Sequence, residues 1–140
     1  MRHVGFTLVE LAIVILIVGI LASASIPAFY RMRARAREAG VRSNAHTVQL
    51  AAEDFAAQNG GVYATDDTTV LPSGETLTDL VSSEIANPFE RLDLTPVVWT
   101  GAADADGRVG YDGSLDPGVR YRITGQGENG IVILTLLNGS

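Results

Sequence analysis

The stretch that decides the fold stands near the start of the chain, where Gly5-Phe6-Thr7-Leu8-Val9-Glu10 leads into LAIVILIVGILASASI at residues 11–26. As a helix, Phe6–Ile26 would be about 32 Å long, close to the ~30 Å thickness of a bilayer's hydrocarbon core. Glu10 is the strongly polar residue in it, and a carboxylate within a membrane costs on the order of 2.5–3.5 kcal/mol. The stretch therefore predicts a membrane-spanning helix whose acid needs a partner or a polar boundary.

A secretory signal peptide is the alternative interpretation of this stretch. Its apolar core usually has about 7–15 residues and ends at small residues, which LASASIPA at residues 21–28 imitates. Two features disfavour it. Glu10 is unfavourable in an ordinary signal sequence, and the helical pattern continues past Pro27.

The charge is divided unevenly along the chain. Residues 1–42 carry six arginines and two acids, a formal +4, whereas residues 43–140 carry four arginines and fourteen acids, a formal -10. An acidic C-terminal part repels phosphate backbones, so direct nucleic-acid binding is disfavoured, although Arg120 and Arg122 form a local basic pair. The chain has no cysteine, which excludes a disulfide framework, a thiol nucleophile and a zinc–thiolate site.

The Gly5–Glu10 segment and the apolar run after it resemble the leader of type IV pilins and type II secretion pseudopilins. Gly19 and Pro27 stand where that family often has a glycine and a proline. The resemblance implies that a membrane aspartyl peptidase, the prepilin peptidase, cuts between Gly5 and Phe6 and then methylates the new amine of Phe6. Residues 1–5 would be the leader, and residues 6–27 the transmembrane and assembly helix.

The same resemblance implies partners and a location. The mature subunit would be held in the inner membrane with its head outside the cytoplasm, and would then enter an extracellular pilus or a periplasmic pseudopilus. The implied partners are copies of the chain or related pilins in a helical filament, the prepilin peptidase, an inner-membrane assembly platform and, before assembly, membrane lipids.

The chemistry of the leader residues agrees with such processing. Gly5 has no side chain and can enter a narrow protease cleft in extended form. After the cut, Thr7 can cap the new helix terminus, and the Phe6 amine of a neighbouring subunit would be a suitable partner for Glu10. The alternative is that Glu10 simply lies near the cytoplasmic headgroups.

The positive-inside rule conflicts with the implied orientation. Arg2 and the initial amine stand on one side of the apolar run, against Arg31, Arg33, Arg35, Arg37 and Arg42 on the other. Charge alone would place the C-terminal part in the cytoplasm. We follow the resemblance, because the leader motif is more specific than a charge count.

The helical pattern continues through residues 28–59 as a stalk that enters the head. Ala34, Val41, Val48 and Phe55 repeat every seven residues, and Asn59–Gly61 supplies a stop. Pro27 removes one backbone hydrogen bond and Gly19 lowers helix propensity by about 1 kcal/mol relative to alanine. We therefore expect a kink or local loosening between these two residues.

The run RMRARARE at residues 31–38 places like charges four residues apart. Two compensating partners remain open: anionic lipid headgroups in the unassembled subunit, or acids on neighbouring heads in a filament. A salt titration of filament integrity tests the second.

The head, residues 60–140, reads as an α+β domain. A short helix is predicted at Leu77–Ser83, capped by Thr76 or a neighbour, and GQGENG at 125–130 reads as a hairpin connection. The expected architecture is a long N-terminal helix whose C-terminal half packs on a small antiparallel sheet. The predicted strands are Leu94–Thr100, Arg108–Tyr111, Val119–Gly125 and Gly130–Leu137.

No catalytic set emerges from the sequence, and the chain is not expected to be an enzyme. His46 is isolated on the predicted helix, His3 falls in the leader, and Trp99 and Tyr121 are expected in the core rather than in a binding site. No cofactor is expected. The candidates for calcium, in a loop whose spacing is not that of an EF-hand, are Asp104, Asp106, Asp112 and Asp116.

Three functional hypotheses follow. The first is a structural subunit assembled by helix packing into a type IV pilus, and the second is a pseudopilin of a type II secretion or DNA-uptake system. The third, from another class, is a membrane-anchored extracytoplasmic binding domain.

Overall fold

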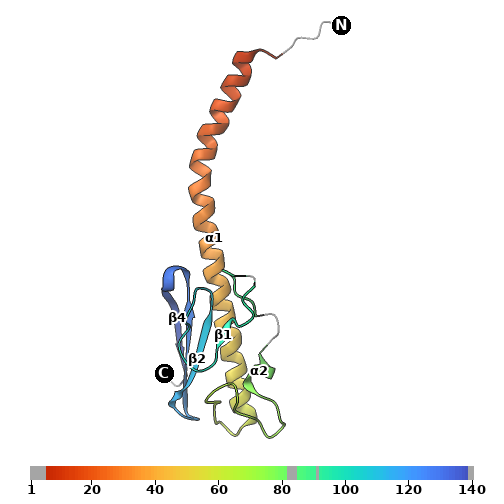
Figure 1. The fold of residues 1–140 in the computed structure, drawn as a ribbon, viewed down its shortest axis with the longest axis vertical. Coiled ribbons are helices and arrows are strands. Elements are labelled where there is room, and N and C mark those ends of the chain that lie inside the picture. The colour runs from red at the N-terminus through yellow and green to blue at the C-terminus, as the bar shows by residue number, and fades with distance from the viewer. Residues whose placement is uncertain (1–5, 82–84, 91, 139–140) are drawn as a thin grey trace. The chain divides into compact units, whose positions relative to one another are not determined.

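The computed structural model describes residues 6–81, 85–90 and 92–138. Contacts divide the chain into two compact units, Met1–Arg35 and Ala36–Ser140. The expected boundaries at residues 5, 27 and 59 stay predictions. Figure 1 shows the elements in chain order, which are α1 (Leu8–Gln58), α2 (Leu77–Leu80), β1 (Val97–Val98), β2 (Val109–Asp116), β3 (Arg120–Gln126), the 3-10 turn η1 (Glu128–Gly130) and β4 (Val132–Leu137).

The first unit consists, in its described part, of the N-terminal portion of α1 and the two residues before it. No residue from Phe6 to Arg35 is buried. The helix is long and apolar enough to cross a membrane. Exposed apolar side chains on every side favour an apolar surrounding, whether lipid or other helices.

Helix α1 continues through Pro27 without interruption. The proline has no N–H to donate to the carbonyl of Ser23. Nearby hydroxyls are satisfied within the helix, because Ser23 Oγ donates to the carbonyl of Ile20 at 2.7 Å and Ser25 Oγ donates to that of Leu21 at 2.9 Å. The kink or loosening expected here stays a prediction.

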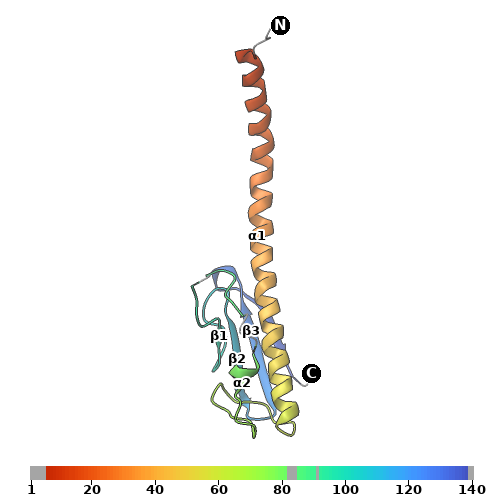
Figure 2. The ribbon, with the colours of Figure 1, turned by 90° about the vertical axis from the view of Figure 1, so that its right-hand side faces the viewer.

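In the second unit, α1 covers one face of the sheet with the predicted stripe (Figure 2). Val41, Val48 and Phe55 are fully buried, as are the alanines between them at 45 and 52. The facing strands contribute a second set of fully buried side chains, Val109, Tyr111, Tyr121 and Ile123. This is the core of the head.

The α+β fold class is confirmed, with one difference in the sheet. The strand order is β1-β2-β3-β4, and β2/β3 and β3/β4 are antiparallel. Strand β1 pairs parallel to β2, with Val97 opposite Val109, so the sheet is mixed rather than antiparallel. The segment between β1 and β2 runs back along the sheet, and there the N–H of Gly101 donates to the carbonyl of Tyr111 at 3.0 Å.

The lengths of three elements also differ from the prediction. Strand β1 has two residues instead of the expected Leu94–Thr100. Strand β2 has eight residues and extends through DGSLD at residues 112–116, which the sequence predicts to be a loop. A register shift between Asp112 and Asp116 accommodates that segment. Helix α2 begins after Thr76 as predicted, and the N–H of Thr76 donates to the Asp79 carboxylate at 2.8 Å. The helix ends at Leu80. Ser82 and Ser83 lie outside the described residues.

Buried Asn87 joins two loops of the head, the segment between α2 and β1 and the segment between β1 and β2. Its side-chain oxygen accepts from the N–H groups of Phe89 and Glu90 at 2.8 and 3.1 Å. Its amide nitrogen donates to the Asp93 carboxylate at 2.8 Å and to the carbonyl of Asp106 at 2.9 Å. One side chain therefore replaces the regular hydrogen bonds that these loops lack.

Candidate assembly site at the helix terminus

The site begins at the first turn of α1, where Thr7 is the residue before the helix. The N–H of Glu10 donates to Thr7 Oγ1 at 3.2 Å. In return, Glu10 Oε2 accepts from the N–H of Thr7 at 2.9 Å and from its hydroxyl at 2.8 Å. This reciprocal arrangement is a capping box, which satisfies helix donors that otherwise have no partner.

Both bonds to the Glu10 carboxylate end on the same oxygen. The part of the chain that the structure describes shows no hydrogen bond to Oε1 and no ion pair to Glu10. The residue is exposed. Glu10 thus has one oxygen held by its own chain and a second oxygen without a hydrogen bond from the described residues.

The sequence contained a signal for this bond that we did not use. Thr-Leu-Val-Glu has the Ser/Thr-x-x-Glu spacing of a capping box. The sequence prediction makes Thr7 a cap, but it gives Glu10 either the amine of another subunit or the cytoplasmic headgroups as its surroundings, and not Thr7. Phe6 is 76% exposed beside this box, whereas Gly5 lies outside the described residues.

The other candidate of the helix is its arginine run. Arg31, Arg33 and Arg35 are exposed, and none takes part in the ion pairs found among the described residues. Arg37 differs, because its guanidinium lies over the ring of Phe89 at 5.4 Å from the centroid. The run therefore ends with a residue that packs on the head.

The calcium candidates are engaged in other interactions. Asp104 pairs with Arg108 at 3.2 Å and Asp112 pairs with Arg122 at 2.9 Å. Asp106 accepts from the N–H groups of Gly130 and Asn129 at 2.8 and 3.0 Å, which lower its pKa. Asp116 is exposed at the end of β2. Among described residues, no three His, Cys, Asp or Glu side chains form a group that could hold a metal ion.

The aromatic residues of the head are mainly structural. Tyr121 is fully buried, and both it and Tyr63 donate to the carboxylate of Glu53, at 2.6 and 2.9 Å. His46 Nδ1 lies 3.2 Å from Gln49 Oε1, on the helix surface. The expectation that Tyr121 belongs to the core is confirmed.

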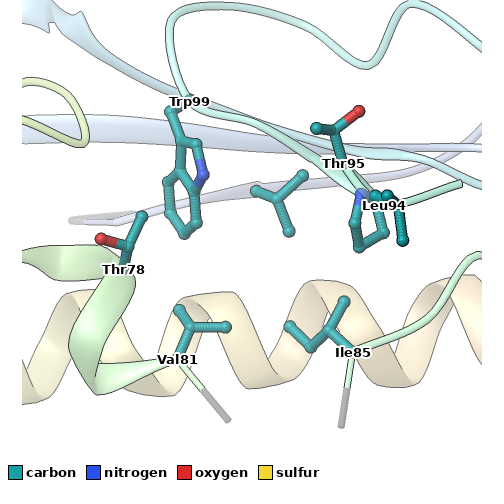
Figure 3. A pocket seen from close by; sticks show the side chains of 8 residues that line it. Thr78, Val81, Ile85, Leu94, Thr95 and Trp99 are labelled. Atoms are coloured by element: carbon teal, nitrogen blue, oxygen red, sulfur yellow. The ribbon is translucent and has the colours of Figure 1, made fainter. Parts of the chain in front are cut away.

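Trp99 is half-buried and lines an open groove between α2 and β1 (Figure 3). The groove has a volume of about 290 Å³, and its opposite wall is formed by Val81 and Ile85. Its lining is mainly apolar, with Thr78 and Thr95 as hydroxyl groups. None of the described residues that line it is charged.

Helix α1 has an apolar N-terminal part with a capped acid, and its C-terminal part packs on a four-stranded sheet. This arrangement is the α+β pilin fold. Comparisons with known proteins place the chain further. It is 39% identical over 74 residues to the type IV narrow pilus major component PilA5 of Thermus thermophilus, a match that covers 53% of this chain and 64% of that protein. It is 41% identical over 54 residues to the type IV major pilin protein PilA of Myxococcus xanthus, covering 39% of this chain and 24% of that protein.

The chain is therefore similar to type IV major pilins, at about 40% identity over the matched residues. It spans less than two thirds of the length of the curated relatives described above. No family model matches it, and no solved structure does. The family is structural rather than catalytic, in agreement with the sequence, which shows no catalytic set.

Proposed function

We propose that this chain is a subunit of a type IV pilus, a major pilin assembled by packing of its N-terminal helix against copies of itself or related pilins. The observation that carries the proposal is the state of Glu10, a carboxylate in an exposed apolar helix with one oxygen bound by Thr7 and the other without a hydrogen bond from the described residues. The names of the two relatives, both major pilus components, support the same function.

Processing supplies the missing partner in this proposal. The prepilin peptidase removes residues 1–5 by cutting between Gly5 and Phe6, and Phe6 is then N-methylated. A methylated amine keeps its positive charge. The amine of Phe6 on a neighbouring subunit then pairs with Glu10 Oε1, so the two chains are held in a fixed register.

The exposed helix explains where the subunit resides before and after assembly. Large apolar side chains such as Leu8, Leu16 and Leu21 are 84%, 63% and 63% exposed. Each is stabilised by removal from water, first by inner-membrane lipids with the head extracytoplasmic, then by neighbouring helices in the extracellular filament. An inner-membrane assembly platform transfers the subunit from one surrounding to the other.

Two substitutions at Glu10 test the proposal. Glu10→Gln keeps an oxygen that can accept from Thr7 but removes the charge, and Glu10→Ala removes both. We expect both variants to be cleaved and inserted normally, as measured by mass and membrane fractionation, but to give about tenfold less sheared filament. Glu38→Gln, also on α1, is the matched control and should assemble normally. Normal filament yield from both Glu10 variants would contradict the proposal.

The pseudopilin alternative and the binding-domain alternative have separate tests. Electron microscopy of sheared surface material should show abundant long fibres containing this chain, whereas their absence would favour a pseudopilin. Gly5→Leu should block cleavage and export to the surface. Unchanged mass and localisation of that variant would favour a membrane-anchored binding domain.

A further inference from the structure

Three exposed arginines of α1, Arg31, Arg33 and Arg35, form what we call the collar. They follow Ile26, the end of the apolar run, by five to nine residues, or about 7–14 Å along a helix. The headgroup region of a bilayer is roughly 5–8 Å thick on each side. Side chains on a helix point toward its N-terminus, so these long side chains reach back from the collar to the headgroups.

The collar surrounds the helix. At about 100° per residue, Arg31 and Arg35 lie on one side, and Arg33 lies about 160° from each of them. A single neighbouring protein surface contacts a helix from one side and would meet only part of this set. Lipid headgroups surround an isolated helix and can meet all three.

The collar forms no ion pair with the part of the chain that the structure describes. All three arginines are exposed and outside the ion pairs of the described residues, while Arg31 and Arg35 repel each other across one turn. Arg37 is half-buried over the ring of Phe89, so it belongs to the head and not to the collar. An anionic partner outside the chain would remove the repulsion.

An aromatic pair stands directly before the collar. Phe29 and Tyr30 are 64% and 63% exposed, with their rings edge to face and 6.2 Å between centroids. Exposed aromatic residues at the end of an apolar run are typical of the membrane–water interface. This pair therefore places the interface next to the arginines.

We propose that the collar binds the phosphates of anionic phospholipids in the leaflet on the head side of the membrane, before the subunit is assembled. The inference rests on the proposed membrane span of α1. Each arginine near an anionic surface strengthens binding by about fivefold. The collar thereby favours anionic lipids around the unassembled helix and releases them when neighbouring helices replace the lipid.

Lipid selection at the collar can be measured by fluorescence quenching. The full chain carrying Tyr30→Trp and Trp99→Phe has its single indole at the interface, next to the collar. It is reconstituted in phosphatidylcholine bilayers that contain brominated phosphatidylcholine or brominated phosphatidylglycerol, and quenching gives the relative association of the two headgroups. We expect a preference for phosphatidylglycerol.

Two variants with equal charge changes complete the experiment. Arg31→Gln with Arg33→Gln should lower the preference at least fivefold, whereas Arg42→Gln with Arg120→Gln, also two exposed arginines, should leave it unchanged. An equal preference in all variants, or none in the starting chain, would overturn the inference. If the starting chain shows no lipid preference and its filaments are weakened by salt, the collar pairs with acids of a second copy instead. Absence of quenching by either brominated lipid would instead contradict the membrane span and the proposed function.

Discussion

The backbone N–H and the hydroxyl of Thr7 donate to a single carboxylate oxygen of Glu10, at 2.9 and 2.8 Å. The bonds lie within one helical turn, so they need no second subunit. They reduce the cost of an acid in an apolar helix and hold the carboxylate against the first turn. Glu10 is thus oriented before any neighbour arrives.

Thr7→Val keeps the shape of the side chain but removes the hydroxyl. We expect loss of about 0.5–2 kcal/mol of helix-terminus stability, because the N–H of Glu10 loses its acceptor. Filament yield should fall, but less than in Glu10→Ala, since the Thr7 N–H can still bind the carboxylate. Thr7→Ser retains the hydroxyl and should assemble normally. Equal yields from the Val and Ser variants would show that the cap does not contribute to assembly.

Tyr111→Phe should destabilise the head. The Tyr111 hydroxyl is buried and donates to the carbonyl of Ala64 at 2.6 Å, so its removal leaves a buried acceptor without a partner. We expect the free energy of unfolding in urea to fall by about 1–3 kcal/mol. Tyr63→Phe should cost less, because Glu53 keeps its bond from Tyr121. A larger loss from Tyr63→Phe would contradict this assignment.

Gly107→Ala tests the contact between two loops. Gly107 has φ +85° and a Cβ there would collide with the side-chain amide of Asn87. Gly74 has φ +94° but open space around it. Gly74→Ala should therefore lower the free energy of unfolding only by the cost of the backbone strain, about 1–2 kcal/mol. Gly107→Ala should lower the free energy of unfolding in urea by more than about 3 kcal/mol. Equal losses would show that Asn87 moves aside freely.

Stability at acid pH should depend on Asp93. Its side chain is 4% exposed, and bonds from Arg108 and then Asn87 hold its pKa well below the usual 3.8. Because the folded pKa lies below the unfolded value of 3.8, the stabilisation by the carboxylate is complete above the unfolded pKa. It is lost as the pH falls from there toward the folded pKa. Asp93→Asn should flatten the pH dependence of unfolding between about pH 4 and pH 2. Asp116→Asn, at an exposed position, is the control, and an equal flattening there would contradict the assignment.

The sequence predicted the features that depend on periodicity. The seven-residue spacing of Val41, Val48 and Phe55 located the buried face of α1, and alternation located β3. Local patterns carried this information because each follows from the geometry of one element. The cap at Thr7 was predictable for the same reason, because it depends on residues within one helical turn.

Features that depend on distant residues were not predictable. Strand β1 pairs parallel to β2 because of the path of residues 99–108, and nothing in LDLTPVVWT shows how short that strand is. The role of Asn87 depends on Asp93 and Asp106, which lie elsewhere in the sequence. The acids of DADGRVGYDG pair with arginines or backbone, and their spacing alone did not reveal those partners.

The mass and N-terminal residue of the chain recovered from sheared surface filaments test the central claim most directly. The account predicts filaments built of this chain as Phe6–Ser140, with one added methyl group on the Phe6 amine. Filaments lacking this chain, or a membrane-bound chain that still begins before Phe6, would contradict it.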